Sequence, residues 1–242
     1  MDYTINQAGA TSVSALLSAS GAATEGLKAV WLSYPTATFV PAARFDEELE
    51  VAEGTSCLRT YDEGDCMCDA LYRVVGELRM ATECTCTFGH EGGYQLHTIL
   101  GDACNKKGKP SDIALIRDLA PVMASQAICD EGKAIGRVAL QALDLFGDEI
   151  EPHFTKKQCP TCGCDAFKTF HVLVSKCTGC GKCLKACDDG AILGKAKFVH
   201  VINQRKCTQC GACLEACPEG AVVRAGAKRP KTPPKPIPVR RK

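Results

Sequence analysis

The sequence has no long apolar run and almost no excess of charge of either sign. None of its apolar stretches approaches the roughly 18 residues that a membrane-spanning helix needs. A formal net charge of +1 over 242 residues argues against a general nucleic-acid or membrane surface. Residues 1–22 carry no basic residue before the short apolar patch 13–17, which is unlike a secretory signal peptide. We therefore expect a cytoplasmic protein.

The residue patterns of common catalytic centres are also missing. We find no paired acid and base, no nucleophile triad and no phosphate-binding loop, and residues 1–60 contain no G-x-G-x-x-G nucleotide cradle. His90, in the stretch FGHEGG, is the one histidine that suggests chemistry, and a surface or scaffold role is the simpler interpretation. The chain alone is therefore not expected to be a complete catalyst.

Cysteine, in contrast, is abundant, with 18 residues. In a secreted chain they would indicate a disulfide framework. Here an export signal is missing and eight cysteines fall in two ladders with metal-ligand spacing, so reduced metal ligands are the better interpretation. For the earlier cysteines, disulfides stay the alternative, and the isolated Cys57 and Cys104 fit buried apolar roles.

The two ladders share the C-x2-C-x2-C-x3-C spacing of bacterial ferredoxins, in which the fourth cysteine binds the other cluster. The stretch KCTGCGKCLKACDDGAIL aligns without gaps on KCTQCGACLEACPEGAVV, although Asp188 stands where the second copy has Pro218. Soft thiolates select iron–sulfur clusters or zinc, and a pair of zinc knuckles is the alternative. We predict two 4Fe–4S clusters, the first held by Cys177, Cys180, Cys183 and Cys217 and the second by Cys207, Cys210, Cys213 and Cys187.

Apolar periodicity predicts an α+β chain in four segments. Short apolar stretches with Gly and Pro punctuation indicate a small β-rich domain over 1–62. Residues 63–157 should form a helical bundle, with one helix over 67–81, one within 110–125 that has Ser111 as N-cap, and one within 130–147 that ends just before Gly147. The ferredoxin module covers 158–226. The basic, Pro-rich residues 227–242 predict a disordered tail, either a solubilising end or a docking arm for an acidic partner.

Four stretches in this order resemble a known family. They are KAVWLSYPTATFVP, EELEVAEGTSCLRTYDEGDCMCDALYRVVGEL, CDEGKAIGRVALQALDLFGDEIEPHF and QCPTCGC. Over about residues 25–223 the chain resembles the C-terminal part of the NADH-binding flavoprotein subunit of respiratory complex I. The likeness is greatest to the β-subunit of soluble electron-bifurcating hydrogenases and formate dehydrogenases. The resemblance implies a β-grasp-like domain, a helical cluster domain and an appended two-cluster ferredoxin.

The departures from this family matter for function. The family's FMN- and NADH-binding half has no counterpart in these residues, so we expect this chain to bind neither. The family's helical-domain cluster uses a C-x2-C-x2-C run and a distant cysteine, for which this sequence offers Cys84 and Cys86, with Cys129 as the distant one. Cys104 or Cys68 is left to complete a 2Fe–2S or altered 4Fe–4S site. We take Cys84, Cys86, Cys104 and Cys129 as the candidate third cluster, with loss of that cluster as the alternative.

The hydrogenase branch also implies a structural zinc that holds the ferredoxin to the helical domain. Carried onto this chain, its ligands are Cys66, His153, Cys159 and Cys164, with Cys162 as a competing ligand. Three thiolates and one imidazole suit a closed tetrahedral zinc site.

Together these features predict an iron–sulfur electron-transfer subunit of a cytoplasmic multi-subunit oxidoreductase that is flavin-, NAD(P)- or ferredoxin-linked. Hydrogenase and formate dehydrogenase are the types implied, with electron bifurcation left open. The expected partners are flavoprotein, hydrogenase or dehydrogenase subunits and soluble ferredoxin, with no nucleic acid and no membrane span. A metal-stabilised docking scaffold and a redox sensor are the alternatives.

Overall fold

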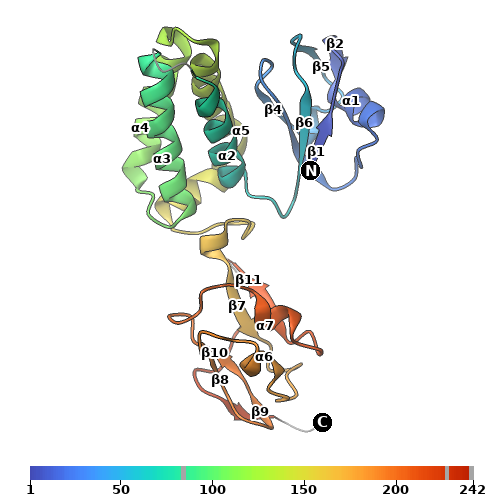
Figure 1. The fold of residues 1–242 in the computed structure, drawn as a ribbon, viewed down its shortest axis with the longest axis vertical. Helices are drawn as coiled ribbons and strands as arrows, with labels where there is room; N and C mark the ends of the chain where they lie inside the picture. The colour runs from blue at the N-terminus through green and yellow to red at the C-terminus, as the bar shows by residue number, and fades with distance from the viewer. Residues whose placement is uncertain (83–85, 227–228, 240–242) are drawn as a thin grey trace. The chain divides into compact units, whose positions relative to one another are not determined.

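The computed structural model describes residues 1–82, 86–226 and 229–239, and the chain divides into two compact units, 1–163 and 164–242 (Figure 1). Each unit has its own core, and both helices and strands contribute, which confirms the predicted α+β class. In the part of the chain described, no helix is both long and apolar enough to cross a bilayer.

The first unit begins with a four-stranded sheet in which every neighbouring pair is antiparallel. Helix α1 follows a Ser12 N-cap, whose hydroxyl accepts from the Ala15 N–H, and packs Leu16 and Leu17 into the sheet's core. Strands β2 and β5 form a separate ribbon. The sheet order is β1 (Asp2–Thr4), β6 (Cys57–Asp62), β3 (Leu27–Leu32), β4 (Thr38–Pro41); β2 is Gly9–Ser12, α1 Val13–Ser20, the 3-10 turn η1 Ala42–Arg44 and β5 Glu48–Val51.

Four helices then form an antiparallel bundle, seen beside the sheet in Figure 1. The last residue of α3, Cys104, meets Cys68 in the first turn of α2, so these two helices run in opposite directions. We call one end of the bundle the Cys66 end and the other the Cys86 end. The helices are α2 (Met67–Ala81), α3 (Gly93–Cys104, preceded by the π-turn η2, Phe88–Gly92), α4 (Pro110–Gln126) and α5 (Asp130–Thr155).

Two predicted helix ends are wrong. The N-cap of α4 is Lys109 rather than Ser111, because Pro110 takes the first helical position and the Asp112 carboxylate accepts from the Lys109 N–H at 2.8 Å. The last helix does not end at Gly147. It bends at Phe146 (φ −128°, ψ 25°) and continues for two more turns to Thr155. That continuation carries His153, so the error concerns function.

The sheet and the bundle of the first unit are joined through α5. The Gln141 side chain accepts from the Phe39 N–H at 2.9 Å and donates to the Thr38 hydroxyl at 2.7 Å. The Phe39 and Phe146 rings pack edge to face, with their centroids 6.0 Å apart. The bend in α5 therefore lies where the helix contacts β4. These contacts hold the middle of α5, up to and including the bend, against β4.

The second unit repeats one small motif twice. In each copy, a cysteine ladder with a one-turn helix is followed by a strand. The strand that follows one ladder pairs with the strand that precedes the other ladder. The Leu173 N–H donates to the Ala221 carbonyl, and the Asn203 N–H donates to the Ala191 carbonyl, both at 2.7 Å. The pairs are β7 (Thr169–Val172) with β11 (Val222–Ala225) and β8 (Ile192–Leu193) with β10 (Val201–Ile202); the helices are α6 (Lys182–Lys185) and α7 (Ala212–Glu215). A short 3-10 turn, η3 (Asp165–Phe167), precedes β7.

The basic C-terminal segment differs from its prediction. Strand β12 (Ile237–Pro238) pairs with β9 (Phe198–Val199), and the Val239 N–H donates to the Lys197 carbonyl at 3.0 Å. Ile237 and Val239 pack on the core of the unit. The expectation of a disordered tail over 227–242 is therefore wrong for this stretch, because two apolar residues within the Pro-rich sequence find a free strand edge.

Candidate metal centres

The first four-cysteine set gathers around Cys183, the buried third cysteine of the first ladder. Cys177 and Cys180 of the same ladder and Cys217 of the other ladder lie close enough to act electrostatically on it. Burial, then these three neighbours, raises the pKa of the Cys183 thiol to about 11. The Cys183 thiol thus resists deprotonation in the absence of a positive charge, so the set suits a cationic iron–sulfur core that supplies that charge.

The second set repeats this arrangement around Cys213. Burial, with the neighbouring Cys207, Cys210 and Cys187, raises the pKa of the Cys213 thiol to about 11. These four cysteines line one cavity together with Phe170. The structure therefore brings together both sets as the sequence grouped them, each with three cysteines of one ladder and the fourth of the other.

Backbone conformation opens each set to a cluster. Gly181 and Gly211, each following the second cysteine of its ladder, have φ of +76° and +85°, a conformation that favours glycine. The fourth cysteines are held alike: the Cys187 sulfur accepts from the Ala191 N–H and the Cys217 sulfur from the Ala221 N–H, both at 3.3 Å. Amide hydrogen bonds to sulfur are among the factors that set cluster potentials.

At the Cys66 end of the bundle, the ligand atoms of Cys66, His153, Cys159 and Cys164 all lie within 4.8 Å of one another. All four residues are buried, and the Cys66 sulfur is 3.3 Å from His153 Nε2. Two ligands of one tetrahedral zinc lie about 3.5–3.8 Å apart, given Zn–S and Zn–N bonds of about 2.3 and 2.0 Å. The donor set therefore fits zinc, and the competing ligand Cys162 is not among the residues gathered here.

Local structure orients these ligands. Cys66 is the N-cap of α2, and His153 lies in the last turn of α5. His153 Nδ1 is 3.0 Å from the Glu149 carbonyl, which requires a donor at Nδ1 and makes Nε2, beside the Cys66 sulfur, the nitrogen that would bind metal. Gly163 lies so close that a Cβ on it would be 2.7 Å from the Cys66 Cβ. Only glycine fits this position without displacing the loop.

The Glu149 carboxylate also holds the end of α5 that carries His153 in place. Its two oxygens accept from the Met67 N–H at 2.6 Å and from the Lys28 ammonium at 2.9 Å. The Lys28 ammonium also donates to the Asp65 carbonyl. Glu149 thus ties β3, the start of α2 and the helix that carries His153 together.

At the Cys86 end, two of the four predicted third-cluster cysteines come together. The Cys129 N–H donates to the Cys86 sulfur at 3.3 Å, and the thiols of Cys86 and Cys129 are hydrogen-bonded to each other. Gly89 stands where a C-x2-C spacing from Cys86 would put the next cysteine. A Cβ there would lie 2.8 Å from the Cys86 sulfur and 2.4 Å from the Cys129 sulfur.

Cys104, another of the candidates, does not join this pair. Cys104 lies at the Cys66 end, 3.8 Å from the Cys68 sulfur and beside Asp69, a full helix length from the start of α3. Cys84 lies outside the described residues. With glycine in the third position, the described residues at this end do not fit a 4Fe–4S cluster.

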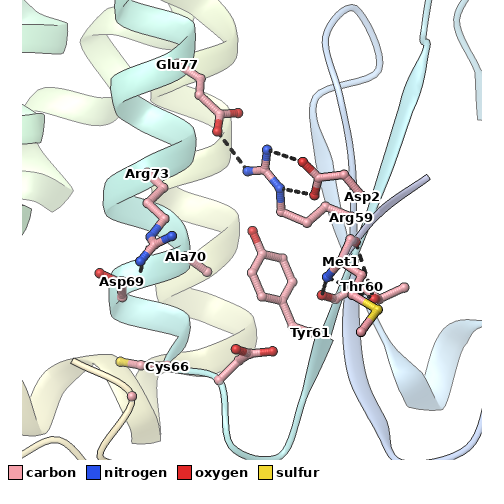
Figure 2. Close-up of a pocket in the computed structure, with 12 residues that line it drawn as sticks. Met1, Asp2, Arg59, Thr60, Tyr61, Cys66, Asp69, Ala70, Arg73 and Glu77 are labelled. Carbon is pink, nitrogen blue, oxygen red and sulfur yellow. Dashed lines mark hydrogen bonds and ion pairs between the residues drawn. The ribbon is translucent and has the colours of Figure 1, made fainter. Parts of the chain in front are cut away.

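His90 is partly exposed, and its Nδ1 is 3.2 Å from the Glu91 carboxylate, which agrees with a surface role. Figure 2 shows a polar cavity of about 370 Å³ between β1, β6 and α2 in the first unit. Its Arg59 guanidinium binds Asp2 at 2.6 Å and Glu77 at 2.8 Å. Arg73 is paired with Asp69, so both guanidinium groups that line the cavity already have carboxylate partners.

Comparison with known proteins defines the class. Residues 74–153 match the NADH-ubiquinone oxidoreductase-F iron–sulfur binding region, and residues 176–229 match the 4Fe–4S dicluster domain. The chain is thus an iron–sulfur electron-transfer protein, and the resemblance found in the sequence is confirmed.

Its relatives are parts of larger enzymes. The chain is 30% identical to the NADP-reducing hydrogenase subunit HndC of Solidesulfovibrio fructosivorans over 61% of this chain and 30% of that protein. It is 32% identical to the F subunit of the NADH-quinone oxidoreductase of Streptomyces coelicolor over 44% of this chain and 24% of that protein. It therefore spans less than a third of either relative.

A solved structure shares the fold. The crystal structure of an NAD+-reducing [NiFe]-hydrogenase in the H2-reduced state aligns with a TM-score of 0.53 at 14% identity, covering 60% of this chain and 26% of that one.

Proposed function

We propose that this chain is the iron–sulfur relay of a cytoplasmic multi-subunit oxidoreductase, with two 4Fe–4S clusters and one structural zinc. The observation that carries the proposal is the reciprocal gathering of the two ladders, in which Cys217 joins the first set and Cys187 the second. When bound, such clusters carry single electrons. The protein's part is to hold the thiolates, donate amide hydrogen bonds to sulfur and limit the access of water.

The route for electrons would pass through the outer edge of each set. Cys180 and Cys210, the second cysteine of each ladder, are exposed, whereas Cys183 and Cys213 are buried. The second cysteine of each set would therefore be open to a partner, while the fourth cysteine of each set comes from the other ladder and would link the two sites. The relatives point to hydrogenase or NADH-linked flavoprotein subunits as partners, or to soluble ferredoxin.

The helical domain, in this proposal, keeps the scaffold of the family's cluster without the cluster. Cys86 and Cys129 are in direct contact, Gly89 takes the third position and Cys104 lies at the far end of α3. The two thiolates that the described residues bring together here are too few to hold a cubane. The electron relay would then consist of the two clusters of the second unit.

Zinc, in this proposal, is structural. The four buried ligands leave no open coordination position for a substrate, as in closed zinc sites. His153 is oriented by the Glu149 carbonyl, the kind of outer contact that ligating histidines commonly make. The metal would hold the loop 159–164 on the Cys66 end of the bundle.

The test is to purify the chain without oxygen, quantify iron, acid-labile sulfide and zinc, and follow its EPR spectrum during a reductive titration. We expect about eight irons, the coupled spectrum of two reduced 4Fe–4S clusters and one zinc. Extra irons with a separate spectrum would show that the helical domain still binds a cluster. Well-folded protein with far fewer than eight irons would refute the relay and favour the docking scaffold.

A further inference from the structure

A buried histidine in the second unit has no visible hydrogen-bond partner. His200 lies between β9 and β10 with only 1% of its surface exposed. In the described part of the chain, neither its Nδ1 nor its Nε2 is hydrogen-bonded. Burial lowers the pKa of this imidazole, so at neutral pH the ring is uncharged and carries one N–H. A buried donor without an acceptor is costly, and such a group calls for an explanation.

The ring is held in place by glycine. A Cβ on Gly194 would lie 2.3 Å from His200 Cδ2, so any larger residue there would push the ring away. On another side, His200 Nε2 lies 4.0 Å from the position of a Cβ on Gly181. Gly181 directly follows Cys180, so the imidazole packs against the loop of the first cysteine set.

The internal repeat shows what usually fills this position. Because Leu173 and Asn203 make equivalent strand hydrogen bonds, the residues three before them correspond, namely Phe170 and His200. Phe170 lies 3.6 Å from the Cβ position of Gly211, the counterpart of Gly181, and lines the cavity of the second cysteine set. The chain therefore places an apolar ring beside one set and a hydrogen-bond donor beside the other.

We propose that His200 donates its ring N–H to a sulfur atom of the cluster held by Cys177, Cys180, Cys183 and Cys217, and so tunes that cluster. This inference rests on the proposed binding of two 4Fe–4S clusters. Reduction adds negative charge, and a donor to sulfur stabilises the more negative state, so the hydrogen bond raises the reduction potential. The first cluster becomes the better electron acceptor of the two. The amide bonds to Cys187 and Cys217 are equal in length and do not create this difference.

The decisive measurement is the pair of midpoint potentials in the whole chain, from EPR-monitored redox titration of the wild type and three variants. His200→Phe makes the two copies alike and removes the donor. For the first cluster, we expect the equilibrium constant for reduction to fall roughly tenfold, which lowers its midpoint potential by about 59 mV for a one-electron couple. The midpoint potential of the second cluster should not change. His200→Gln keeps an N–H donor and should retain most of the wild-type separation. Phe170→His adds a donor to the second set and should raise the other potential instead.

Iron content separates the outcomes. Variants that keep about eight irons but show unchanged potentials would overturn the role of His200 while leaving the proposed clusters intact. If the wild type itself binds no pair of 4Fe–4S clusters, the proposed function fails first. If His200→Phe loses iron, the Phe170→His variant still tests the inference. A raised midpoint potential of the second cluster in that variant supports the inference, and an unchanged potential refutes it.

Discussion

The buried ion pair between Lys28 and Glu149 gives a direct test of how the first unit is held together. Their side chains are only 13% and 16% exposed, and Glu149 also accepts from the Met67 N–H in the first turn of α2. Removing one partner of a buried pair typically costs about 3–5 kcal/mol, because the other charge is left uncompensated. Here Lys28 keeps the Asp65 carbonyl, so we expect Glu149→Ala to lower the free energy of unfolding by about 3 kcal/mol.

Urea unfolding followed by tryptophan fluorescence measures this change locally. Trp31 is the only tryptophan, lies 2% exposed in β3 and therefore reports on the first unit. With a slope of about 2–3 kcal/mol per molar urea, the midpoint should fall by about 1 M. The matched control on the same helix is Asp144→Ala, which removes an exposed pair with Arg117 and should change stability by less than about 0.5 kcal/mol.

A double variant identifies the cause. Lys28→Met combined with Glu149→Met removes both charges and should recover much of the loss, because a stranded charge accounts for most of it. If Glu149→Ala matches the control, or if the double variant is worse than Glu149→Ala alone, the reasoning about this pair is wrong. Zinc content in the same samples shows whether the turn that carries His153 still binds metal, because the Glu149 backbone carbonyl beside His153 Nδ1 remains in Glu149→Ala.

Three further changes address the metal centres. Cys187→Ser should damage only the cluster of the second ladder and lower iron from about eight to about four, measured by iron analysis and EPR; loss of the first ladder's signal would contradict the crossed ligation. Gly163→Ala forces a Cβ to within 2.7 Å of the Cys66 Cβ and should lower zinc content, whereas Gly147→Ala, with its nearest neighbour at 3.9 Å, should not. Gly89→Cys supplies the missing third thiol and should raise iron by up to about four; unchanged iron would mean that more than this residue was lost.

The spacing of the cysteines in the two ladders predicted which of them lie together, because ligand spacing carries chemical information. The ladder spacing grouped the eight thiolates, and the helix over 67–81 has the predicted ends because its apolar face is regular. Spacing could not show that Cys104 lies at the Cys66 end, because α3 was not foreseen. The sequence did contain a signal that was missed, since Gly89 follows Cys86 at the interval where the family pattern needs another cysteine.

Tertiary contacts explain the other misses. Gly147 has the local character of a helix end, but contacts between α5 and the sheet carry the helix past it with a bend at Phe146. Composition likewise predicted a disordered tail, whereas Ile237 and Val239 pack on the ferredoxin core. His200 lies outside the cysteine motifs, and its burial beside Gly181 without a hydrogen-bond partner among the described residues is visible only in the folded chain.

A second asymmetry between the two ladders acts in the same direction as His200 and can be separated from it. Helix α6 carries Lys182 and Lys185, where α7 has Ala212 and Glu215, so the short helix of the first ladder is the more positive of the two. The two lysine side chains are exposed. Salt screens exposed charges, because the Debye length falls from about 10 Å at 0.1 M to about 3 Å at 1 M. A hydrogen bond inside the core is not screened in this way. We therefore expect the gap between the two midpoint potentials to narrow at high salt without closing, and the remaining gap to disappear in His200→Phe. A gap that vanishes in salt alone would assign the difference to the lysines.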